Sequence, residues 1–450
     1  MDFCIRFSRA QNHSLNKCVI LLGMPQQLTP PNIIDRSMEI HEWLPQITLW
    51  VGLILMLALV FNRYGKKLGF PSGVLFLGLG MFCGEDGPLQ IDYYDFDLTY
   101  GVGMICLILI LFYAGLGIKI PHMRGAWTPA IVLATVGVIM ISALIAVFVK
   151  LWHPTISWTE ALLIGSVLGS TDAAAVFAAL VGVGFKGRVR QIVELESGLN
   201  DPMAFILVFA FTAIVMGKEM SSVEIAIDVL TQFIIGGAAG LLMGWLTTQS
   251  FKFLPSQETG LDPIRSVACA AASFGLASVF GGSGLVSVFL CAILLGNSKL
   301  PLRSTIVRVH DSLAWGGQIT MFFMLGLLST PHRLLNHQIL IGGSLVALWL
   351  AFVARPVAVA VILFPMRIPW REIVCVAWLG LRGAVPIILS TIPLLFLGNP
   401  DVAPRAQLLF DLVFFCVVVG CFIPGTIIKV IPRWLGMLTP KTLAQEEAEA

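Results

Sequence analysis

Long apolar stretches, separated by short polar loops, fill the chain from residue 44 to residue 430. A helix that crosses a bilayer needs about 20 mostly apolar residues, and thirteen stretches match that length or come close to it. The pattern predicts membrane helices at residues 44–62, 70–84, 99–119, 127–151, 158–181, 190–216, 225–250, 263–280, 284–297, 309–329, 337–365, 371–397 and 405–430. The second and ninth are short for a full crossing. The predicted fold class is an all-α polytopic membrane protein with about 13 transmembrane helices.

The composition agrees with this pattern. The chain is 57% hydrophobic and only 12% charged, with a mean hydropathy of +0.89, which is more apolar than a soluble domain of this length can bury. The 28 Lys and Arg residues nearly cancel the 26 Asp and Glu residues, so the net charge indicates no nucleic-acid partner, and we expect none. The nine cysteines show no metal-ligand spacing, so we expect them to be small core residues. No cofactor is predicted, and the partners expected are membrane lipid and transported ions.

Basic residues alternate between the loops and give an orientation. Eighteen Lys and Arg residues fall in the loops of one side, whereas the other side has only four: Lys150, Lys218, Arg333 and Arg405. Because Lys and Arg are retained in cytoplasmic loops, the N-terminus is predicted outside and the C-terminus in the cytoplasm. This alternation also supports an odd number of spans, since one missed helix would disturb it. The predicted location is the cytoplasmic (inner) membrane.

The two ends of the chain carry little functional information. Residues 1–43 form a polar tail without a stretch long enough to cross a membrane, and Met38 is an alternative start. Residues 431–450 are predicted to be a short cytoplasmic tail. The transmembrane domain is therefore predicted at residues 44–430.

Two predicted helices are interrupted at matching positions. The fifth contains Gly169-Ser170-Thr171-Asp172, and the twelfth contains Gly380-Leu381-Arg382-Gly383-Ala384-Val385-Pro386. Helices one to six and eight to thirteen would run in opposite senses, which predicts inverted repeats at about residues 44–216 and 263–430. Interrupted helices at matching positions of two inverted halves indicate the substrate site of a secondary transporter.

Two intramembrane carboxylates are the strongest candidates for that site. Asp172 lies in the middle of the fifth helix, and Asp201 begins the apolar run that continues from Pro202. Such residues are rare in membranes and are functional candidates by default. The alternative is that each carboxylate caps a helix or half-helix. Burial disfavours the charged form of a carboxylate, so a proton and a cation can compete for it.

Polar neighbours extend the candidate site along one helix. Glu196 with Asn200, and Ser197 with Asp201, are four residues apart and share one helical stripe. Glu196 is predicted to form a structural ion pair with Arg382, because an arginine in the membrane interior stays charged and needs a carboxylate.

Three further groups have separate assignments. Arg355 is a second intramembrane arginine, and the sequence indicates no partner for it. Glu194 is four residues from Arg190 and is predicted to pair with it. The adjacent pair His310-Asp311 is predicted to be an interface or capping pair rather than a proton relay.

Four motifs give a specific resemblance: GSTDAAAVFAAL (169–180), ELESGLNDPMA (194–204), VHDSLAW (309–315) and GLRGAVPIILS (380–390). They resemble the monovalent cation:proton antiporter 1 family, and are closest to its bacterial potassium/proton antiporter branch, with similarity from about residue 50 to residue 437. The resemblance implies a sodium/proton antiporter-like fold, a homodimer and elevator-like alternating access. It also implies exchange of protons for K⁺ or Na⁺, serving cation and pH homeostasis or volume regulation.

The resemblance also implies roles for individual residues. The Thr171 main chain, Asp172, Ser197 and Asp201 would surround the transported cation, and Asn200 would hold Asp172 or the unwound segment. Asn200 stands where an electrogenic relative would have a second Asp, which implies electroneutral, one-for-one exchange.

Two features depart from the pattern of that branch. Tyr113 occupies a position near the end of the third helix where these relatives usually have an acidic residue. The sequence also ends soon after the last predicted helix, where close relatives carry a cytoplasmic regulatory region, so regulation through such a region is not carried over.

Two other functional classes fit the sequence less well. An intramembrane aspartyl protease would also need two aspartates on neighbouring helices, but no GxGD run is present, and Glu196, Asn200 and Arg382 would have no evident task. A cation channel would need a continuous pore with repeated ligands, whereas a single asymmetric site suits alternating access. The sequence therefore favours a transporter over an enzyme.

Overall fold

The computed structural model describes residues 45, 48–49, 51–60, 72–180, 184–254, 258, 260–300, 302–396, 403–426 and 430–439. The chain divides into two compact units, residues 1–61 and 62–450. The first contains the apolar helix Val51–Val60, and the second contains all the elements discussed below. The described residues of the second unit are helical, apart from turns, loops and one isolated β-bridge between Phe185 and Leu438.

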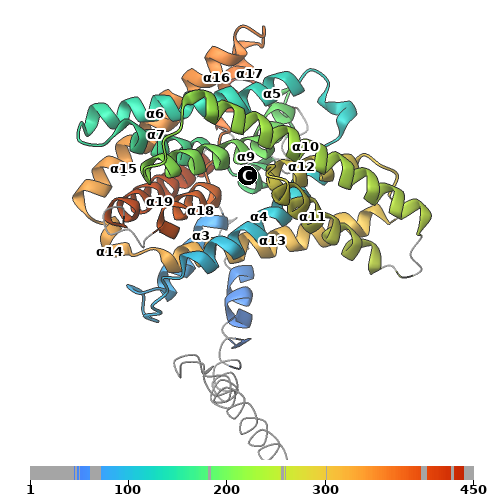
Figure 1. Ribbon diagram of the computed structural model, residues 1–450, viewed down its shortest axis with the longest axis horizontal. Helices are drawn as coiled ribbons and strands as arrows, with labels where there is room; N and C mark the ends of the chain where they lie inside the picture. The colour runs from blue at the N-terminus through green and yellow to red at the C-terminus, as the bar shows by residue number, and fades with distance from the viewer. Residues whose placement is uncertain are drawn as a thin grey trace, which may run out of the picture. The chain divides into compact units, whose positions relative to one another are not determined.

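The helices of the second unit follow the predicted apolar stretches (Figure 1). Their bounds are α3 Ser72–Cys83, α4 Phe96–Gly117, η2 Ile120–Met123, α5 Trp127–Val132, η3 Leu133–Gly137, α6 Val138–Trp152, α7 Trp158–Gly169, α8 Ala173–Leu180, α9 Val189–Val215, α10 Ser222–Phe253, α11 Leu261–Val279, α12 Gly284–Gly296, α13 Arg303–Leu328, α14 Pro331–Leu334, α15 His337–Trp349, η4 Leu350–Ala354, α16 Arg355–Leu363, α17 Trp370–Trp378, α18 Ala384–Thr391, η5 Pro393–Phe396, α19 Ala403–Thr426 and α20 Val430–Trp434.

Five continuous helical stretches in the described part of the chain are long and apolar enough to cross a membrane. They are Phe96–Gly117, Trp127–Trp152, Val189–Val215, Ser222–Phe253 and His337–Leu363. Shorter apolar helices include the two that the sequence predicted to be short, α3 and α12. One boundary differs clearly: α13 begins at Arg303 rather than at residue 309, because the helix continues into a polar segment that hydropathy does not mark.

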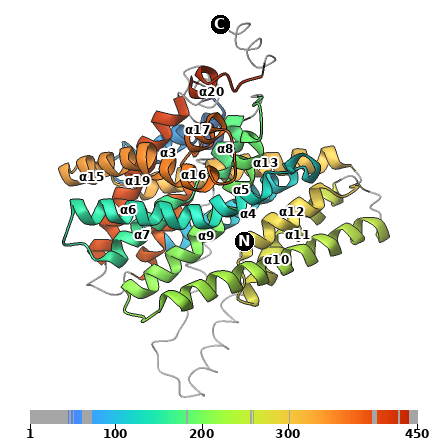
Figure 2. The ribbon, with the colours of Figure 1, turned by 90° about the horizontal axis from the view of Figure 1, so that it is seen from above.

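The helices pack in two groups. In the first helix group, α13 packs on α3 and α4, α12 packs on α4 and α10, and α11 packs on α10 and α12. The second helix group contains α5 to α9 and α15 to α19, with contacts of α6 on α7, α7 on α9, α16 on α17, and α19 on α15 and α18. Figure 2 shows α10, α11 and α12 together on one side and α6, α15 and α19 on the other. Helix α9 belongs to the second group but also contacts α4, α10 and α12 of the first, and it is buried along most of its length.

Two π-helical turns interrupt long helices at corresponding places. The segment η3 lies between α5 and α6, and η4 lies between α15 and α16, in the fourth and eleventh predicted spans. Such turns shift the register of the following residues and occur often at functional sites. In this protein, η4 is followed directly by Arg355.

The last described residues contact the loop between α8 and α9. The Lys186 N–H donates to the Met437 carbonyl at 2.8 Å, and the Thr439 N–H donates to the Gly184 carbonyl at 3.0 Å. The same loop is held by Glu372 at the start of α17, whose carboxylate accepts the Arg188 N–H at 3.1 Å. These contacts hold residues 184–188, which directly precede α9.

Candidate functional site

Both predicted helix interruptions are present. Helix α7 ends at Gly169, and Ser170 has an extended backbone (φ −72°, ψ 153°) before α8 begins at Ala173. Helix α17 ends at Trp378, and residues 379–383 separate it from α18. Glycines and polar residues favour such breaks in otherwise apolar helices, because freed backbone groups find partners inside the protein.

The two interrupted segments contact each other through Asp172. The Asp172 N–H donates to the Leu381 carbonyl at 3.0 Å, which joins the segments directly. The Asp172 carboxylate accepts the Ala175 N–H at 3.1 Å with Oδ1 and the Ala384 N–H at 3.1 Å with Oδ2. It therefore caps the N-termini of both α8 and α18, where the helix dipoles favour negative charge. The capping contacts of the alternative are therefore present at two half-helices, while the role of Asp172 as a cation ligand stays a prediction.

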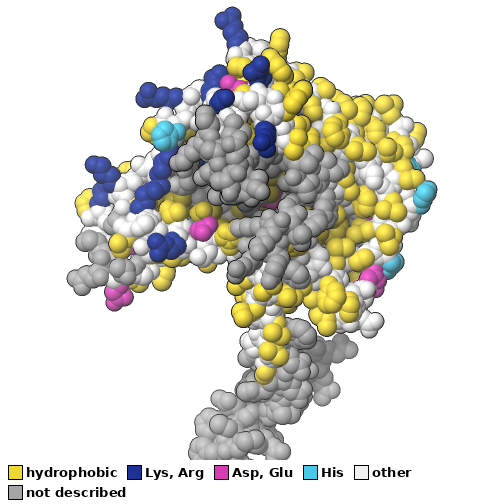
Figure 3. Space-filling view, turned by 180° about the vertical axis from the view of Figure 1, so that it is seen from behind, with side chains coloured by type: hydrophobic (Ala, Val, Ile, Leu, Met, Phe, Trp, Pro, Cys, Tyr) yellow, Lys and Arg dark blue, Asp and Glu magenta, His cyan; other side chains and the backbone are white. Residues whose placement is uncertain are grey.

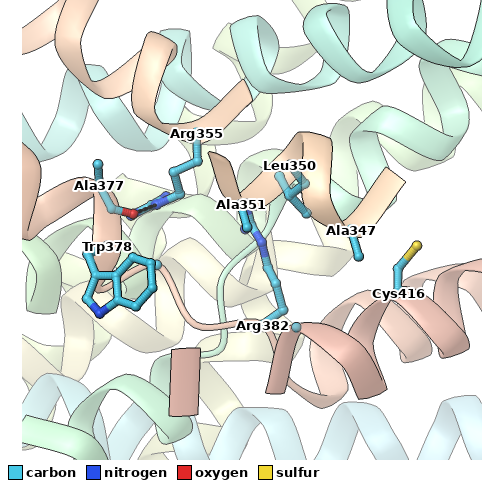
Figure 4. Close-up of a pocket in the computed structure, with 10 residues that line it drawn as sticks. Ala347, Leu350, Ala351, Arg355, Ala377, Trp378, Arg382 and Cys416 are labelled. Atoms are coloured by element: carbon cyan, nitrogen blue, oxygen red, sulfur yellow. Dashed lines mark hydrogen bonds between the residues drawn. The ribbon is translucent and has the colours of Figure 1, made fainter. Parts of the chain in front are cut away.

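Arginines occupy the opposite, negative ends of the other two half-helices. Arg382 donates to the carbonyls of Gly169, at 3.0 Å, and Ser170, at the end of α7. Arg355 donates to the carbonyl of Ala377 at 3.3 Å, at the end of α17 (Figure 4). Cations at helix C-termini offset the partial negative charge of the unpaired carbonyls. We call the place where the two interrupted segments, residues 170–172 and 379–383, meet the crossing. There, one carboxylate offsets the partial positive charge of two helix N-termini, and two guanidinium groups offset the partial negative charge of two helix C-termini.

The partner of Glu196 differs from the prediction. Glu196 accepts two hydrogen bonds from Arg355, at 2.7 Å and 3.0 Å, and both side chains are buried. The expected pairing with Arg382 is wrong as the main contact of Glu196. The sequence gives the depth of each arginine only to within about one turn, whereas a π-turn directly before Arg355 and a helix break at Arg382 determine where each side chain points.

Two glycines permit this close packing. A Cβ on Gly383 would lie 1.6 Å from Asp172 Oδ2, and a Cβ on Gly380 would lie 1.9 Å from Arg355 Nε. Neither distance is compatible with a side chain at these positions. The GLRGAV motif therefore supplies one arginine and two glycines, and the glycines make room for Asp172 and for the second arginine.

Asp201 has a different environment from Asp172. It lies inside the continuous helix α9 rather than at a helix start, so the alternative that it is an N-cap is wrong. Its exposed fraction is 0%, and neither carboxylate oxygen has a hydrogen-bond partner among the described residues. Asp172 and Arg382 are the charged groups that act on it electrostatically. A buried carboxylate without donors is costly, unless a proton or a bound cation neutralises it.

The remaining candidate residues connect α9 to the broken helix. The Thr171 hydroxyl donates to Ser197 Oγ at 3.2 Å, and the Asn200 amide donates to Thr171 Oγ1. Asn200 therefore holds the unwound segment at Thr171, as one of the two expected arrangements required. In the described part of the chain, Asn200 Oδ1 and Ser170 Oγ are buried without a hydrogen-bond partner. Buried oxygens without donors are suited to replace part of the hydration shell of a cation.

Two secondary assignments are settled by the same geometry. Glu194 pairs with Arg190 at 2.7 Å, as predicted. Helix α13 begins about two turns before His310, so His310-Asp311 is not a helix-capping pair. His310 is instead buried in the helix packing, where its ring lies 4.8 Å from that of Phe112 and its Nε2 lies 2.8 Å from Ser266 Oγ.

A small cavity lies beside the two arginines. Arg355, Arg382 and Trp378 line it together with apolar residues of α15, η4 and α19, and its volume is about 30 Å³ (Figure 4). A space of this size holds about one water molecule.

The role of Arg355 was missed by sequence reasoning, although its position in an apolar stretch already marked it as an intramembrane charge in need of a partner.

Comparison with known proteins places these features in a family. The pattern of the family described as "Sodium/hydrogen exchanger, transmembrane" matches residues 52–434. The chain is 37% identical over 395 residues to the K(+)/H(+) antiporter NhaP of Alkalimonas amylolytica, covering 87% of this chain and 67% of that protein. It is 24% identical to the Na(+)/H(+) antiporter NhaS2 of Synechocystis over 93% of this chain and 76% of that protein.

The fold is also similar to that of a solved structure. The sodium proton antiporter MjNhaP1 from Methanocaldococcus jannaschii, at pH 8, superposes with a TM-score of 0.74. The match has 23% sequence identity and covers 87% of this chain and 99% of that one.

Proposed function

The chain belongs to the sodium/hydrogen exchanger family, and from this premise we propose that it exchanges protons for a monovalent cation, K⁺ or Na⁺, across the cytoplasmic membrane. Its relatives are named as K⁺/H⁺ and Na⁺/H⁺ antiporters, so it is a transporter and not an intramembrane protease. Cation and pH homeostasis, or volume regulation, are the processes that such exchange serves.

The observation that carries this proposal is the buried, unpartnered carboxylate of Asp201 beside the crossing of two broken helices. In one phase of the cycle, Asp201 binds the dehydrated cation together with Asp172, Ser197 and the main chain of Thr171. In the other phase, a proton neutralises Asp201. Because one group holds either ligand, the two cannot be carried together, and each drives movement of the other.

Asp172 and the arginines keep the crossing assembled during the cycle. Asp172 is held by two helix N-termini, which favours its ionised form. Asn200 orients the unwound segment through Thr171 and is neutral in both phases. The Glu196–Arg355 pair fixes α9 to α16 and to the end of α17. We therefore assign the exchange of proton for cation to Asp201. Asp172 contacts the cation without exchanging a proton, and Arg382 and the Glu196–Arg355 pair have a structural role.

For the architecture, we propose thirteen transmembrane helices in one domain at residues 44–430. The domain would consist of inverted repeats at about 44–216 and 263–430. Two features support the repeats: π-turns in the fourth and eleventh spans, and breaks in the fifth and twelfth. The second helix group would move against the first, in a homodimer. Cross-linking in native membranes tests the dimer, and its absence there would remove it from the proposal.

The N-terminus is assigned to the outside and the C-terminus to the cytoplasm. Besides the loop charges, the surface supports a polarised arrangement, because Figure 3 shows Lys and Arg side chains gathered on one part of the face in view and hydrophobic side chains over much of the rest. A reporter fused to residue 450 that is active only outside the cell would contradict this orientation.

Proton flux in everted membrane vesicles tests the function. Addition of K⁺ or Na⁺ should dissipate a pre-formed proton gradient, and the more effective ion identifies the preferred cation. Asp201→Asn and Asp172→Asn should each abolish this exchange while the protein remains in the membrane at its normal level. Asp228→Asn, on the mostly exposed helix α10, serves as the control for the loss of one carboxylate. Substantial cation/proton exchange by Asp201→Asn would remove the central claim.

A further inference from the structure

Two buried thiols face each other in the first helix group, away from the crossing. Cys269 on α11 and Cys291 on α12 have exposed fractions of 4% and 0%, and their Sγ atoms lie 3.2 Å apart. The Thr247 hydroxyl, on α10, donates a hydrogen bond to Cys269 Sγ at 2.8 Å. Three helices therefore converge on this pair of sulfur atoms, and the proposed exchange cycle uses neither of them.

The register of the two helices accounts for the approach. Helices α11 and α12 run antiparallel and are joined by the short turn at residues 280–283. One helical turn from the thiols, Ser273 Oγ lies 2.7 Å from Ser287 Oγ, and Ser287 Oγ also donates to the Ser273 carbonyl at 2.8 Å. Cys269 precedes Ser273 by four residues, and Cys291 follows Ser287 by four. The thiols therefore occupy the next facing position of the same interface.

From this geometry we infer that Cys269 and Cys291 form an oxidisable dithiol, which a hydroperoxide converts into a disulfide between α11 and α12. A disulfide has an S–S distance of about 2.05 Å, so the sulfur atoms need to approach by only about 1 Å. Because the two Sγ atoms already face each other, we expect side-chain rotation to supply this movement. No other pair of cysteine sulfur atoms in the described part of the chain is recorded at this distance. Cys416, for example, has its Sγ 3.2 Å from the carbonyl oxygen of Gly343.

The chemistry balances with hydrogen peroxide as the oxidant. One deprotonated sulfur attacks a peroxide oxygen, the O–O bond breaks, and a sulfenic acid and hydroxide form; the released thiol proton converts hydroxide to water. The second sulfur then attacks the sulfenic sulfur, and the departing hydroxide takes up the second thiol proton as water. In total, two thiols and one H₂O₂ give one disulfide and two waters. Hydrogen peroxide is small and uncharged, which suits it to a site inside a helix bundle.

The disulfide would restrain α12, which packs against α9 beside the candidate site. Phe289, two residues from Cys291, packs its ring against α9 at Gly198, where an added Cβ would lie 2.1 Å from the ring. Gly198 is adjacent to Ser197. Oxidation therefore links α11 covalently to the helix that supports α9 next to the candidate cation ligands.

Alkylation of the purified full chain tests the inference. The protein is treated with hydrogen peroxide or left untreated, denatured, labelled with N-ethylmaleimide and digested, and labelling is measured by mass spectrometry. We expect labelling of Cys269 and Cys291 to fall together, with appearance of a cross-linked peptide that is lighter by two hydrogens than its parts, whereas Cys416 keeps its label. Dithiothreitol should restore labelling, and the unfolding temperature should be higher in the oxidised form.

A matched variant shows whether oxidant reaches this part of the bundle. Ser273→Cys with Ser287→Cys, in a Cys269→Ser, Cys291→Ser background, places two thiols at the neighbouring position of the same interface. If this pair becomes cross-linked and the native pair stays fully labelled, the inference is overturned. Loss of label at Cys269 and Cys291 without the cross-linked peptide overturns it as well, because each thiol would then react independently. These outcomes do not depend on transport, so they do not test the antiport proposal.

Discussion

Asp172 and Asp201 are both buried carboxylates, but their surroundings give them different chemistry. Asp172 accepts backbone N–H groups from two half-helices, which compensates its charge inside the protein. Asp201 has no such donors in the described part of the chain, so its charge has to be neutralised by a ligand. This contrast, rather than the mere presence of two intramembrane acids, favours Asp201 as the residue that exchanges proton for cation.

Gly383 gives a prediction at the scale of one residue. Gly383→Ala places a Cβ against Asp172 Oδ2, so the carboxylate must leave the N-terminus of α18. We expect a loss of cation/proton exchange and a destabilisation of about 1 to 3 kcal/mol, as for other overpacked sites. Vesicle flux and the unfolding temperature measure the two effects. Gly316→Ala on α13, where an added Cβ meets nothing within 4 Å, is the control. Normal exchange by Gly383→Ala would show that the double cap is dispensable.

At the scale of helices, the charged residues act mainly on helix ends. Arg382 serves the C-terminus of α7, and Arg355 serves that of α17. Glu196 lies on the continuous helix α9 and pairs with Arg355, so α9 is connected to the end of α17. Unpaired backbone groups of the broken helices can therefore lie in the membrane interior. Each helix N-terminus there has a carboxylate partner, and each C-terminus has an arginine partner.

The Glu196–Arg355 pair predicts an energetic coupling. Removing one partner of a buried ion pair costs about 3 to 5 kcal/mol, whereas replacing both is milder. Arg355→Met and Glu196→Gln should each lower the unfolding temperature, and the double variant should recover part of the loss. Recovery stays partial because Arg355 also serves α17. A parallel cycle with Glu196→Gln and Arg382→Met is the control and should show weaker coupling. Stronger coupling in the Arg382 cycle would restore the pairing expected from sequence.

A surface contact between the α3–α4 loop and α14 predicts a pH dependence. The backbone N–H of His332, followed by its ring, holds the pKa of Asp86 below its ordinary value. A lowered pKa in the folded state stabilises the fold above the ordinary aspartate value, about 3.9, and this contribution disappears as the pH falls through the lowered pKa.

Asp86→Asn should therefore reduce the unfolding temperature slightly at neutral pH, and the difference from the wild type should shrink below about pH 4. The contribution is small, under about 1 kcal/mol, because the contact is largely exposed. Asp92→Asn in the same loop controls for the loss of one acidic charge. A difference that keeps growing below about pH 4 would have the wrong sign for this contact.

At the scale of the whole molecule, the charge carried across the membrane depends on how many groups titrate. One cation bound at Asp201 and one proton returned on it move no net charge. If Asp172 also released a proton, each cycle would move one charge, and a potential of 100 mV would bias it by about 2.3 kcal/mol. Two helix N-termini hold the Asp172 carboxylate, and we propose that it does not exchange a proton during the cycle.

We therefore expect turnover that is independent of membrane potential. Cation-driven proton movement is measured in sealed proteoliposomes, with the potential clamped by an ionophore system that does not use the transported ion. Protein-free liposomes give the control for leak. A current that accompanies transport, or a rate that follows the imposed potential, would mean that a second group exchanges its proton.

The sequence by itself determined the helical pattern, the two helix breaks and most of the residues that the structure brings together there, with the exception of Arg355. The physical reason is that a bilayer demands long apolar helices, so Asp172, Asp201 and Arg382 are conspicuous wherever they lie. Only the tertiary structure decided that Glu196 pairs with Arg355, that Asp172 caps two helices and that Asp201 lacks donors. Those facts depend on side-chain directions across helices distant in sequence, and a π-turn or an unwound residue changes such directions without changing the hydrophobic pattern.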